Sequence, residues 1–360
     1  MENNRTELTR RQFLKTAAIL FGGIGLSSIA AACQRAAEVA PGAQPTKEIA
    51  AVGAPPSAGP RIVDGVPVTS NEDFYTVWYS RGTPPASPAD FKFRLAGMVE
   101  NPIELTLDQL KALPPVTEMR TMECISNPVG GELISNAIWK GVRVKDLLAQ
   151  AKIRNGGAHL KLEALDGFYT GVPIEVGLHD NALLVYEMNG EPLPRDHGAP
   201  LRVLWPGRYG MKQPKWIHTI TVVDKPFQGY WEKQGWTNDA FIHPNARIDT
   251  PKDLAEIADK TFSVSGVAFS GESGIAKIEI SFDDTDQWLA AELSRGPSPF
   301  VWTIWKWTGA ALTVGRHSLY ARVTDKSGRV QPKPGKIRLL DGTFPNGTDE
   351  MHSILIDFKG

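Results

Sequence analysis

The pattern of apolar residues changes at about residue 258, and this change divides the ordered part of the sequence into two domains. Beyond it, apolar residues alternate with polar ones, as Ile278, Ile280 and Phe282 do. Such alternation is typical of strands with one buried face, and turn signals such as Lys326-Ser327-Gly328 separate the strands at short intervals. Residues 258–360 are therefore predicted to form an all-β sandwich of the immunoglobulin type.

The preceding segment, residues 71–250, mixes helix and strand signals. Phe91–Leu95 alternates like a strand, whereas Val142–Ala151 carries an apolar stripe at helical spacing. Strand and helix signals do not alternate regularly, and no glycine-rich phosphate loop is present. These features exclude a doubly wound parallel sheet and predict an irregular α+β domain.

The first residues of the chain form an export signal. Thr9–Lys15 reads Thr-Arg-Arg-Gln-Phe-Leu-Lys, a twin-arginine motif, and the uncharged stretch Thr16–Gln34 follows it. Residues 1–33 are therefore predicted to direct the protein out of the cytoplasm, to a periplasmic or other extracytoplasmic location. Because the twin-arginine route generally carries proteins already folded around a cofactor, the signal favours a redox enzyme.

The end of this signal leaves two outcomes open. Three alanines precede Cys33 and resemble a lipoprotein box, in which Cys33 becomes the acylated first residue and tethers the protein to a membrane. The alternatives are ordinary cleavage near the alanines or an uncleaved anchor helix. Residues 34–70, rich in Ala, Pro and Gly, are predicted to be a flexible linker.

Charge and cysteine content exclude several classes of function. The chain has 39 Lys and Arg against 40 Asp and Glu, whereas a nucleic-acid-binding protein should show a basic excess. Only two cysteines, Cys33 and Cys124, are present, which excludes a disulfide framework and a cysteine-based zinc or iron–sulfur site within one chain. A role for Cys124 is therefore that of a single thiol, and the alternative is a small buried hydrophobic residue.

Three segments of the first domain depart from a simple pattern of core and surface. Cys124 enters a loop of Ser, Asn, Pro and Gly, and such backbone allows the close approach of a ligand. Asp166–Tyr169 is the second segment. The third, residues 194–216, places basic residues among glycines, prolines and aromatic residues. This composition suits an anionic group joined to a flat ring system.

Together these segments resemble the sulfite oxidase family of molybdopterin-dependent oxidoreductases, from about residue 71 to the C-terminus. The resemblance is carried by separate motifs in the family's order: Cys124-Ile125-Ser126-Asn127, Ser135–Val142, Tyr186–Pro194, His197-Gly198, Arg202 and Lys215-Trp216. It implies a molybdopterin-binding domain of the sulfite oxidase type, followed by the sandwich. In that family the sandwich often serves dimerisation, so a homodimer is implied.

The resemblance also implies a cofactor, Mo-molybdopterin, with the sulfur of Cys124 as a ligand of the metal. Thiolate is a soft ligand and suits a metal already held by a pterin dithiolene. Tyr169 is implied to lie near the open face of the metal and Arg81 to face the substrate. The positions implied to contact the cofactor are Tyr79, Ser80, Arg81, Cys124, Asp166, His197, Arg202, Gln213, Pro214 and Lys215.

The sequence departs from animal and plant sulfite oxidases at the implied substrate pocket. Residues 125–129 carry no charge where those enzymes have a pair of arginines, and residues 270–274 lack a further pocket arginine. Unless Arg81, Arg208 or Lys212 compensates, binding of the sulfite dianion should be weaker. The substrate is therefore open between sulfite, a neutral sulfoxide and another small oxo-compound.

Electron transfer requires a partner, because the chain has no Cys-x-x-Cys-His haem motif and no iron–sulfur cluster motif. A c-type cytochrome or a membrane quinone system would serve, in either direction of electron flow. Two other functions remain as alternatives. One is a non-catalytic exported binding or adhesion module with a degenerate cofactor site. The other is a hydrolase with Cys124 as nucleophile and His197 as base, which leaves the basic cluster without a function.

Overall fold

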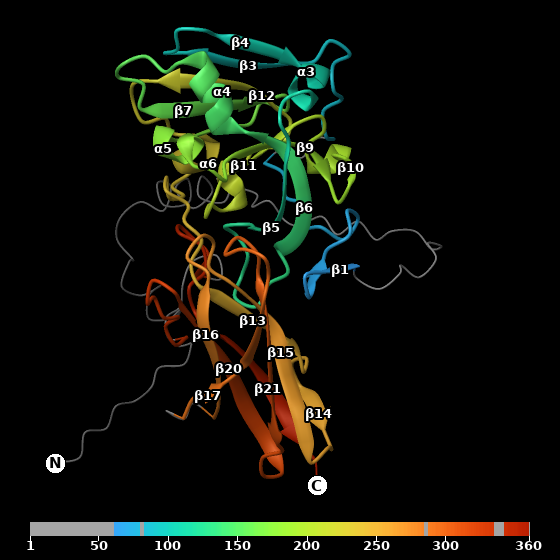
Figure 1. The fold of residues 1–360 in the computed structure, drawn as a ribbon. Helices are drawn as coiled ribbons and strands as arrows, with labels where there is room; N and C mark the ends of the chain where they lie inside the picture. The colour runs from blue at the N-terminus through green and yellow to red at the C-terminus, as the bar shows by residue number, and fades with distance from the viewer. Residues whose placement is uncertain (1–60, 80–82, 284–286, 335–341, 360) are drawn as a thin grey trace, which may run out of the picture. The chain divides into compact units, whose positions relative to one another are not determined.

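The computed structural model describes residues 61–79, 83–283, 287–334 and 342–359 (Figure 1). The predicted export signal, Cys33, most of the predicted linker and two predicted site residues, Ser80 and Arg81, lie outside these ranges. Residues 61–68 fall in the predicted linker but form a hairpin of β1 (Arg61–Val63) and β2 (Val66–Val68). Regular structure therefore begins about ten residues earlier than the predicted start at residue 71, and Val66 and Val68 of this hairpin are buried.

The first domain is built on two five-stranded sheets. One sheet has the order β10 (Glu191–Pro192), β9 (Leu183–Met188), β6 (Ile134–Arg143), β5 (Val116–Glu123), with β11 (Arg202–Leu204) also paired to β9. The other has the order β4 (Ile103–Thr106), β3 (Lys92–Gly97), β12 (Ile217–Val223), β7 (His159–Ala164), β8 (Tyr169–Pro173). Only β12 and β3 pair in parallel among these strands, so the doubly wound arrangement is absent from the described part of this domain, as predicted.

Short helices connect the strands: α3 (Leu107–Lys111), α4 (Val144–Ala151), α5 (Ile174–Leu178), α6 (Tyr230–Lys233) and the 3₁₀ turns η1 (Arg195–His197) and η2 (Gly210–Lys212). The apolar stripe predicted for α4 is confirmed, since Val144, Leu147, Leu148 and Ala151 are all buried. The helix begins two residues later than predicted because Val142 belongs to the long curved strand β6, drawn in green in Figure 1. None of the helices in the described ranges is long and apolar enough to cross a membrane.

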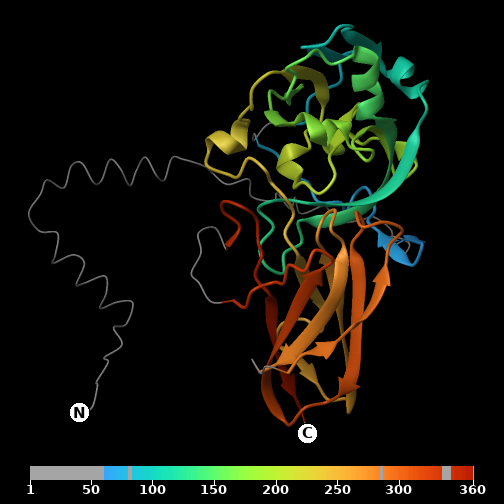
Figure 2. The ribbon, with the colours of Figure 1, turned by 60° about the vertical axis from the view of Figure 1, so that its left-hand side comes forward.

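The second domain is all-β, as predicted (Figure 2). One sheet has the order β13 (Asn245–Thr250), β15 (Thr261–Phe269), β19 (Thr303–Ala310), β18 (Glu292–Arg295). The other has the order β14 (Ala255–Ile257), β21 (His352–Phe358), β20 (Gly315–Asp325), β16 (Ile275–Phe282), β17 (Leu289–Ala290). The alternating residues Ile278, Ile280 and Phe282 are buried in the core of this domain. The first strand, β13, lies within the range predicted for the first domain but pairs with β15.

Asp325 closes the turn after β20 and is 1% exposed. Its carboxylate accepts hydrogen bonds from the Ser327 hydroxyl (2.7 Å) and the Ser270 hydroxyl (3.0 Å), and it forms an ion pair with Arg329 (2.8 Å). Burial by itself would raise the pKa of Asp325, but these hydrogen bonds outweigh it and lower the pKa to about 2. The ionised carboxylate therefore stabilises this end of the domain.

This arrangement predicts a loss of stability in acid. The pKa of Asp325 is lower in the folded state than its ordinary value of 3.8, so its contribution is complete above pH 4 and disappears as the pH falls towards 2. The loss should amount to about 2 kcal/mol of unfolding free energy. Urea unfolding between pH 2 and 5 measures it, and Asp325→Asn should be less stable at pH 5 with a flatter dependence. Parallel losses in both proteins would contradict the assignment.

Candidate active site

Cys124 directly follows β5 and opens the loop that joins it to β6. The Cys124 amide donates to the Leu133 carbonyl and the Asn127 amide donates to the Cys124 carbonyl, both at 3.0 Å. The Asn127 side chain closes the loop by accepting from the Leu133 amide at 3.0 Å. Gly131 lies so close to the side-chain oxygen of Asn127 that a Cβ atom at Gly131 would overlap it. The Asn, Pro and Gly residues of this segment thus produce a tight loop that begins at the thiol.

The Cys124 thiol is buried, with Sγ 3.1 Å from the Ser126 hydroxyl. Burial raises the pKa of the thiol, the Ser126 hydrogen bonds oppose this, and the neighbouring Glu123 raises it further. The thiol is therefore protonated at neutral pH, and a thiolate here requires a nearby positive charge such as a metal ion.

The hydrolase alternative requires a base within hydrogen-bonding distance of Cys124. His197 does not serve, because its Nε2 atom is 2.6 Å from the Asn71 carbonyl and its ring packs edge-on against Phe74. Burial is the main factor that lowers the pKa of His197, to about 4, so the ring is neutral at pH 7. The structure thus lacks the Cys–His pair that a thiol hydrolase needs among the residues it describes.

Arg202, the first residue of β11, is the most informative side chain of the predicted cofactor cluster. It is 4% exposed, donates from Nη1 to the His197 carbonyl (3.1 Å) and lies over the Trp139 ring at 5.1 Å. Its Nε atom has no hydrogen-bond partner, and no carboxylate of the described residues pairs with it. Burial lowers its pKa to about 10, so it stays charged at neutral pH. A buried cation without an anion is costly, and this arrangement fits an anionic ligand.

Lys215 lies beside Arg202. Burial, and next the charge of Arg202, lower the pKa of Lys215 well below its usual range. Its Nζ donates to the Asp196 carbonyl at 3.0 Å and lies over the rings of Trp78 (5.1 Å) and Trp216 (4.5 Å). Asp166 and Asp196 act in the opposite direction but do not outweigh burial and Arg202, so an anionic ligand shared by Lys215 and Arg202 would favour the charged form of Lys215.

Gly198 makes the approach of these segments geometrically feasible. Its φ angle is +114°, in the region that favours glycine. A Cβ atom at this position would lie 3.0 Å from Lys215 and 3.1 Å from the Arg202 Cβ atom. The His-Gly step of the sequence therefore allows His197, Arg202 and Lys215 to gather in one place.

The remaining predicted cofactor contacts in the described ranges have partners within the fold. Asp166 accepts from the Phe168 amide at 3.0 Å, and burial raises the pKa of its carboxyl while Lys215 opposes that shift. Tyr79 donates its hydroxyl to the Asp166 carbonyl at 2.7 Å. Gln213 is engaged within the fold, since its side chain accepts from the Trp205 amide (3.2 Å) and donates to the Arg208 carbonyl (2.6 Å). The Pro214 carbonyl accepts from the Val203 amide at 3.2 Å.

Tyr169 begins β8, and the hydrogen bonds and ring contacts of its side chain in the described residues are with groups other than Cys124. Its ring packs against Phe227 with a centroid distance of 6.0 Å, and its hydroxyl is 3.4 Å from the Lys233 Nζ atom. Lys233 also lies 4.9 Å from the centre of the Tyr169 ring. The implied position of Tyr169 at the metal therefore stays a prediction.

A different tyrosine, Tyr75, is buried near this cluster and is not among the residues predicted from the sequence. Burial raises the pKa of Tyr75 well above its usual range, Cys124 raises it further and Arg202 opposes the shift. The Tyr75 amide donates to the Ser135 hydroxyl at 3.2 Å, which holds this segment against β6. The only signal in the sequence was the Phe74-Tyr75 pair at the start of the first domain. Phe74 packs against both Tyr75 (ring centroids 5.5 Å apart) and His197 (5.4 Å), so Tyr75 lies next to the cluster, and its pKa responds to both Cys124 and Arg202.

Lys212 and Arg208, two of the cations expected to replace the missing pocket arginines, have partners within the fold. Lys212 is 1% exposed and forms an ion pair with Glu232, with further hydrogen bonds to the Gly171 carbonyl (2.9 Å) and the Asn238 side chain (3.2 Å). Arg208 donates to the Asp239 carbonyl at 3.0 Å and lies over a neighbouring phenylalanine ring. Lys212 in particular serves the interior of the domain and does not supply a free charge to a pocket.

The ion pair of Lys212 and Glu232 predicts a specific pattern of stability. Glu232→Leu leaves a buried lysine without its anion and should cost about 3–5 kcal/mol of unfolding free energy. The double variant Lys212→Met/Glu232→Leu should recover most of this loss, because an apolar pair of similar volume replaces both charges. Urea denaturation of the metal-free protein measures both values. A double variant no more stable than Glu232→Leu would show that the pair is not isolated from other charges.

The residues present fit a cofactor that combines an anion with a metal. The unpartnered Arg202 Nε atom and the adjacent Lys215 suit a phosphate, and Cys124 offers one soft ligand. Across the described residues, no group of three or more His, Cys, Asp or Glu side chains could hold a metal ion. A pterin dithiolene would supply the further ligands that a metal bound to Cys124 needs.

Comparisons with known proteins agree with this chemistry. Residues 81–231 match the model of the oxidoreductase molybdopterin binding domain, and residues 238–349 match the Mo-co oxidoreductase dimerisation domain. Mitochondrial sulfite oxidase of Rattus norvegicus is 27% identical over 342 residues, which cover 81% of this chain and 62% of that protein. Sulfite oxidase of Arabidopsis thaliana is 26% identical over 322 residues, 71% of this chain and 81% of the relative.

A bacterial relative and a solved structure extend the comparison. The uncharacterized oxidoreductase YuiH of Bacillus subtilis is 30% identical over 158 residues, covering 42% of this chain and 78% of that protein. The crystal structure of the sulfane dehydrogenase SoxCD from Paracoccus pantotrophus has a TM-score of 0.69 at 21% identity, over 81% of this chain and 84% of that one, and shows the shared fold. This chain spans about three fifths of the length of the animal sulfite oxidases it matches.

Proposed function

Because the chain belongs to the sulfite oxidase family of molybdopterin-dependent oxidoreductases, we propose that it transfers an oxygen atom to or from a small sulfite- or sulfoxide-like substrate. One observation carries the cofactor half of this proposal. Arg202 is a buried cation with an unpartnered donor, and the buried thiol of Cys124 offers a soft metal ligand in the same domain. An anionic pterin bearing a metal is the ligand class that would pair with the Arg202 guanidinium and also bind the Cys124 sulfur.

The residues of the chain would bind and orient the cofactor. Arg202 and Lys215 would neutralise the phosphate, and the guanidinium of Arg202 can bind it through two parallel hydrogen bonds. His197 stays neutral, and the hydrogen bond between its ring and the Asn71 carbonyl holds the start of the first domain in place. When bound, the molybdenum–pterin group supplies two-electron oxygen-atom-transfer chemistry, and Cys124 would be its protein ligand.

The proposed substrate follows from the charges around the Cys124 loop. Residues 125–129 carry no charge, and both Arg208 and Lys212 are engaged elsewhere. This favours a pocket less basic than that of animal and plant sulfite oxidases, in which a neutral sulfoxide or another oxo-compound fits as well as sulfite. Tyr169, with Lys233 beside its hydroxyl, and Arg81 are the residues proposed to face the substrate.

The cellular setting is part of the same proposal. The twin-arginine motif at Thr9–Lys15 supports export to the periplasm or another extracytoplasmic site, and acylation of Cys33 would tether the protein to a membrane. The match to a dimerisation domain supports a homodimer through the C-terminal domain, which we assign to the immunoglobulin type. Electrons would pass to or from a separate protein, such as a c-type cytochrome or a membrane quinone system, since the sequence contains no Cys-x-x-Cys-His motif.

Metal analysis of protein purified from a host that makes the cofactor tests the proposal. We expect near-stoichiometric molybdenum, and turnover with a redox dye in a panel of sulfite, sulfoxides and nitrate would identify the substrate and the direction. Folded protein without molybdenum and without turnover would support the alternative, a non-catalytic exported binding or adhesion module with a degenerate cofactor site. Hydrolysis of a thioester or peptide by metal-free protein would support neither reading.

A further inference from the structure

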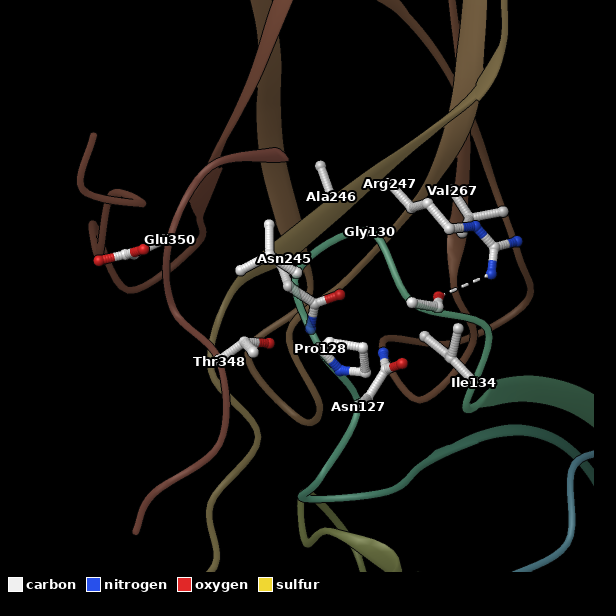
Figure 3. Close-up of a pocket in the computed structure, with 12 residues that line it drawn as sticks. Asn127, Pro128, Gly130, Ile134, Asn245, Ala246, Arg247, Val267, Thr348 and Glu350 are labelled. Atoms are coloured by element: carbon white, nitrogen blue, oxygen red, sulfur yellow. Dashed lines mark hydrogen bonds between the residues drawn. The ribbon is translucent and has the colours of Figure 1, made fainter. Parts of the chain in front are cut away.

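The loop that carries Cys124 is held by residues of the C-terminal domain as well as by its own hydrogen bonds. Three side chains, Asn245 and Arg247 of β13 and His352 of β21, contact the segment between Glu123 and Gly131. Figure 3 shows the first two beside this loop, around a small cavity whose wall also includes Asn127. Strands β13 and β21 belong to the two different sheets of the domain, so both sheets meet the loop.

Asn245 acts through Glu123, the residue before the thiol. The Glu123 side chain is fully buried, and its two carboxylate oxygens accept from different amides. One is Asn127 of the loop itself, at 3.0 Å, and the other is Asn245 of β13, at 2.9 Å. Because Glu123 and Cys124 are adjacent, the position of β13 sets the direction in which the chain enters the loop.

Arg247 holds the far end of the same loop. Its Nη1 atom donates to the Gly131 carbonyl at 3.0 Å, the contact drawn as a dashed line in Figure 3. Its Nε atom donates to Asp249 at 2.6 Å, which orients the guanidinium. The hydrogen bond therefore comes from a side chain that is itself fixed on β13.

His352 supports the loop between these two points. Its Nδ1 atom accepts from the Ile248 amide at 2.9 Å, so the ring is fixed to β13. The opposite edge of the ring lies against Gly130, where a Cβ atom would overlap Nε2. Since the φ angle of Gly130 is +72°, glycine is also the residue that this backbone requires. The three contacts together leave the loop little freedom to move away from the C-terminal domain.

We propose that Asn245, Arg247 and His352 are positioning residues that set the geometry of Cys124, so that the C-terminal domain takes part in the metal site. None of them touches the thiol, and each acts through a loop residue. The contacts by themselves hold the loop, whereas the effect on a bound metal rests on the proposed function. The prediction is that releasing the loop frees the thiol in metal-free protein and alters its bond to the metal in loaded protein.

The first test uses metal-free full-length protein and the rate of Cys124 alkylation by iodoacetamide, with peptide mass spectrometry to separate Cys124 from Cys33. The double variant Asn245→Ala/Arg247→Met should react about tenfold faster than wild type, because the buried thiol becomes accessible through local opening. Arg322→Met is the matched control: it also breaks an arginine–carboxylate pair in this domain, with Glu279, at similar exposure. Its alkylation rate should equal that of wild type.

A double variant within twofold of the control would overturn the proposal, since the loop would then be held by its own hydrogen bonds. If the double variant does not fold, Arg247→Met alone removes one contact at a side chain that is 20% exposed and should give an intermediate rate. An Arg247→Met rate equal to wild type would likewise count against the proposal.

The second test uses the loaded enzyme. At unchanged molybdenum content, Asn245→Ala/Arg247→Met should shift the thiolate-to-metal charge-transfer absorption and the Mo(V) EPR g values, whereas Arg322→Met should leave both as in wild type. Spectra identical to wild type would overturn the positioning of the metal ligand. If wild-type protein binds no molybdenum, the proposed function fails, while the alkylation rates still decide whether the C-terminal domain holds the loop.

Discussion

Cys124→Ser is expected to reduce turnover by on the order of 10³-fold or more, equivalent to about 4 kcal/mol of transition-state stabilisation. Serine replaces sulfur by oxygen at nearly the same volume, so the tight loop from Cys124 to Leu133 should persist. A neutral hydroxyl is a poor substitute for a soft thiolate on a metal held by a dithiolene. The thiolate-to-metal charge-transfer absorption should disappear, and kcat should fall far more than KM changes.

Ser126→Ala provides the control for this prediction. It removes the hydroxyl 3.1 Å from the sulfur without touching the ligand atom. Because the Ser126 hydrogen bonds lower the pKa of the thiol, their loss should weaken turnover modestly, by less than about tenfold, and keep the charge-transfer band. If Cys124→Ser retains both molybdenum and turnover, Cys124 is not the metal ligand.

Arg202→Met is expected to change cofactor binding and stability in opposite directions. Loss of the buried guanidinium should cost about 2–5 kcal/mol of cofactor binding, so molybdenum and pterin should be lost during purification. The metal-free protein should become more stable by about 1 kcal/mol or more, because an apolar side chain replaces a buried charge that has no anion among the described residues. Thermal unfolding of metal-free protein and metal analysis of freshly purified protein measure the two effects.

Arg120→Met is the matched control for that experiment. Arg120 is buried to the same degree, 3% exposed against 4%, but it forms an ion pair with Glu118 at 2.7 Å. Its replacement should destabilise the metal-free protein and leave the molybdenum content unchanged. If Arg202→Met instead destabilised the metal-free protein and kept its molybdenum, Arg202 would be a structural residue and not a ligand of the cofactor.

Local periodicity accounts for the parts of the fold that were predicted correctly. The stripe of Val144, Leu147, Leu148 and Ala151 is buried in α4, and the alternation of Ile278, Ile280 and Phe282 marks a strand with one buried face. Both patterns arise from side-chain direction along a single element. The start of the β domain was placed too late because β13 is recognised by its pairing with β15, a contact between separated segments.

By itself, the sequence determined the family, the single thiol of the described domain and the presence of His197, Arg202 and Lys215 in the family's order, because these depend on residue identity and order. Only the tertiary structure decided which charges are free. From the sequence, Lys212 was a candidate cation for the substrate pocket, but in the folded protein it pairs with Glu232, twenty residues further along. Arg202 has no such anion among the described residues. The sequence also did not predict the burial of Tyr75 or the contacts of Asn245 and Arg247 with the Cys124 loop. Burial and pairing are properties of segments that meet only when the chain folds.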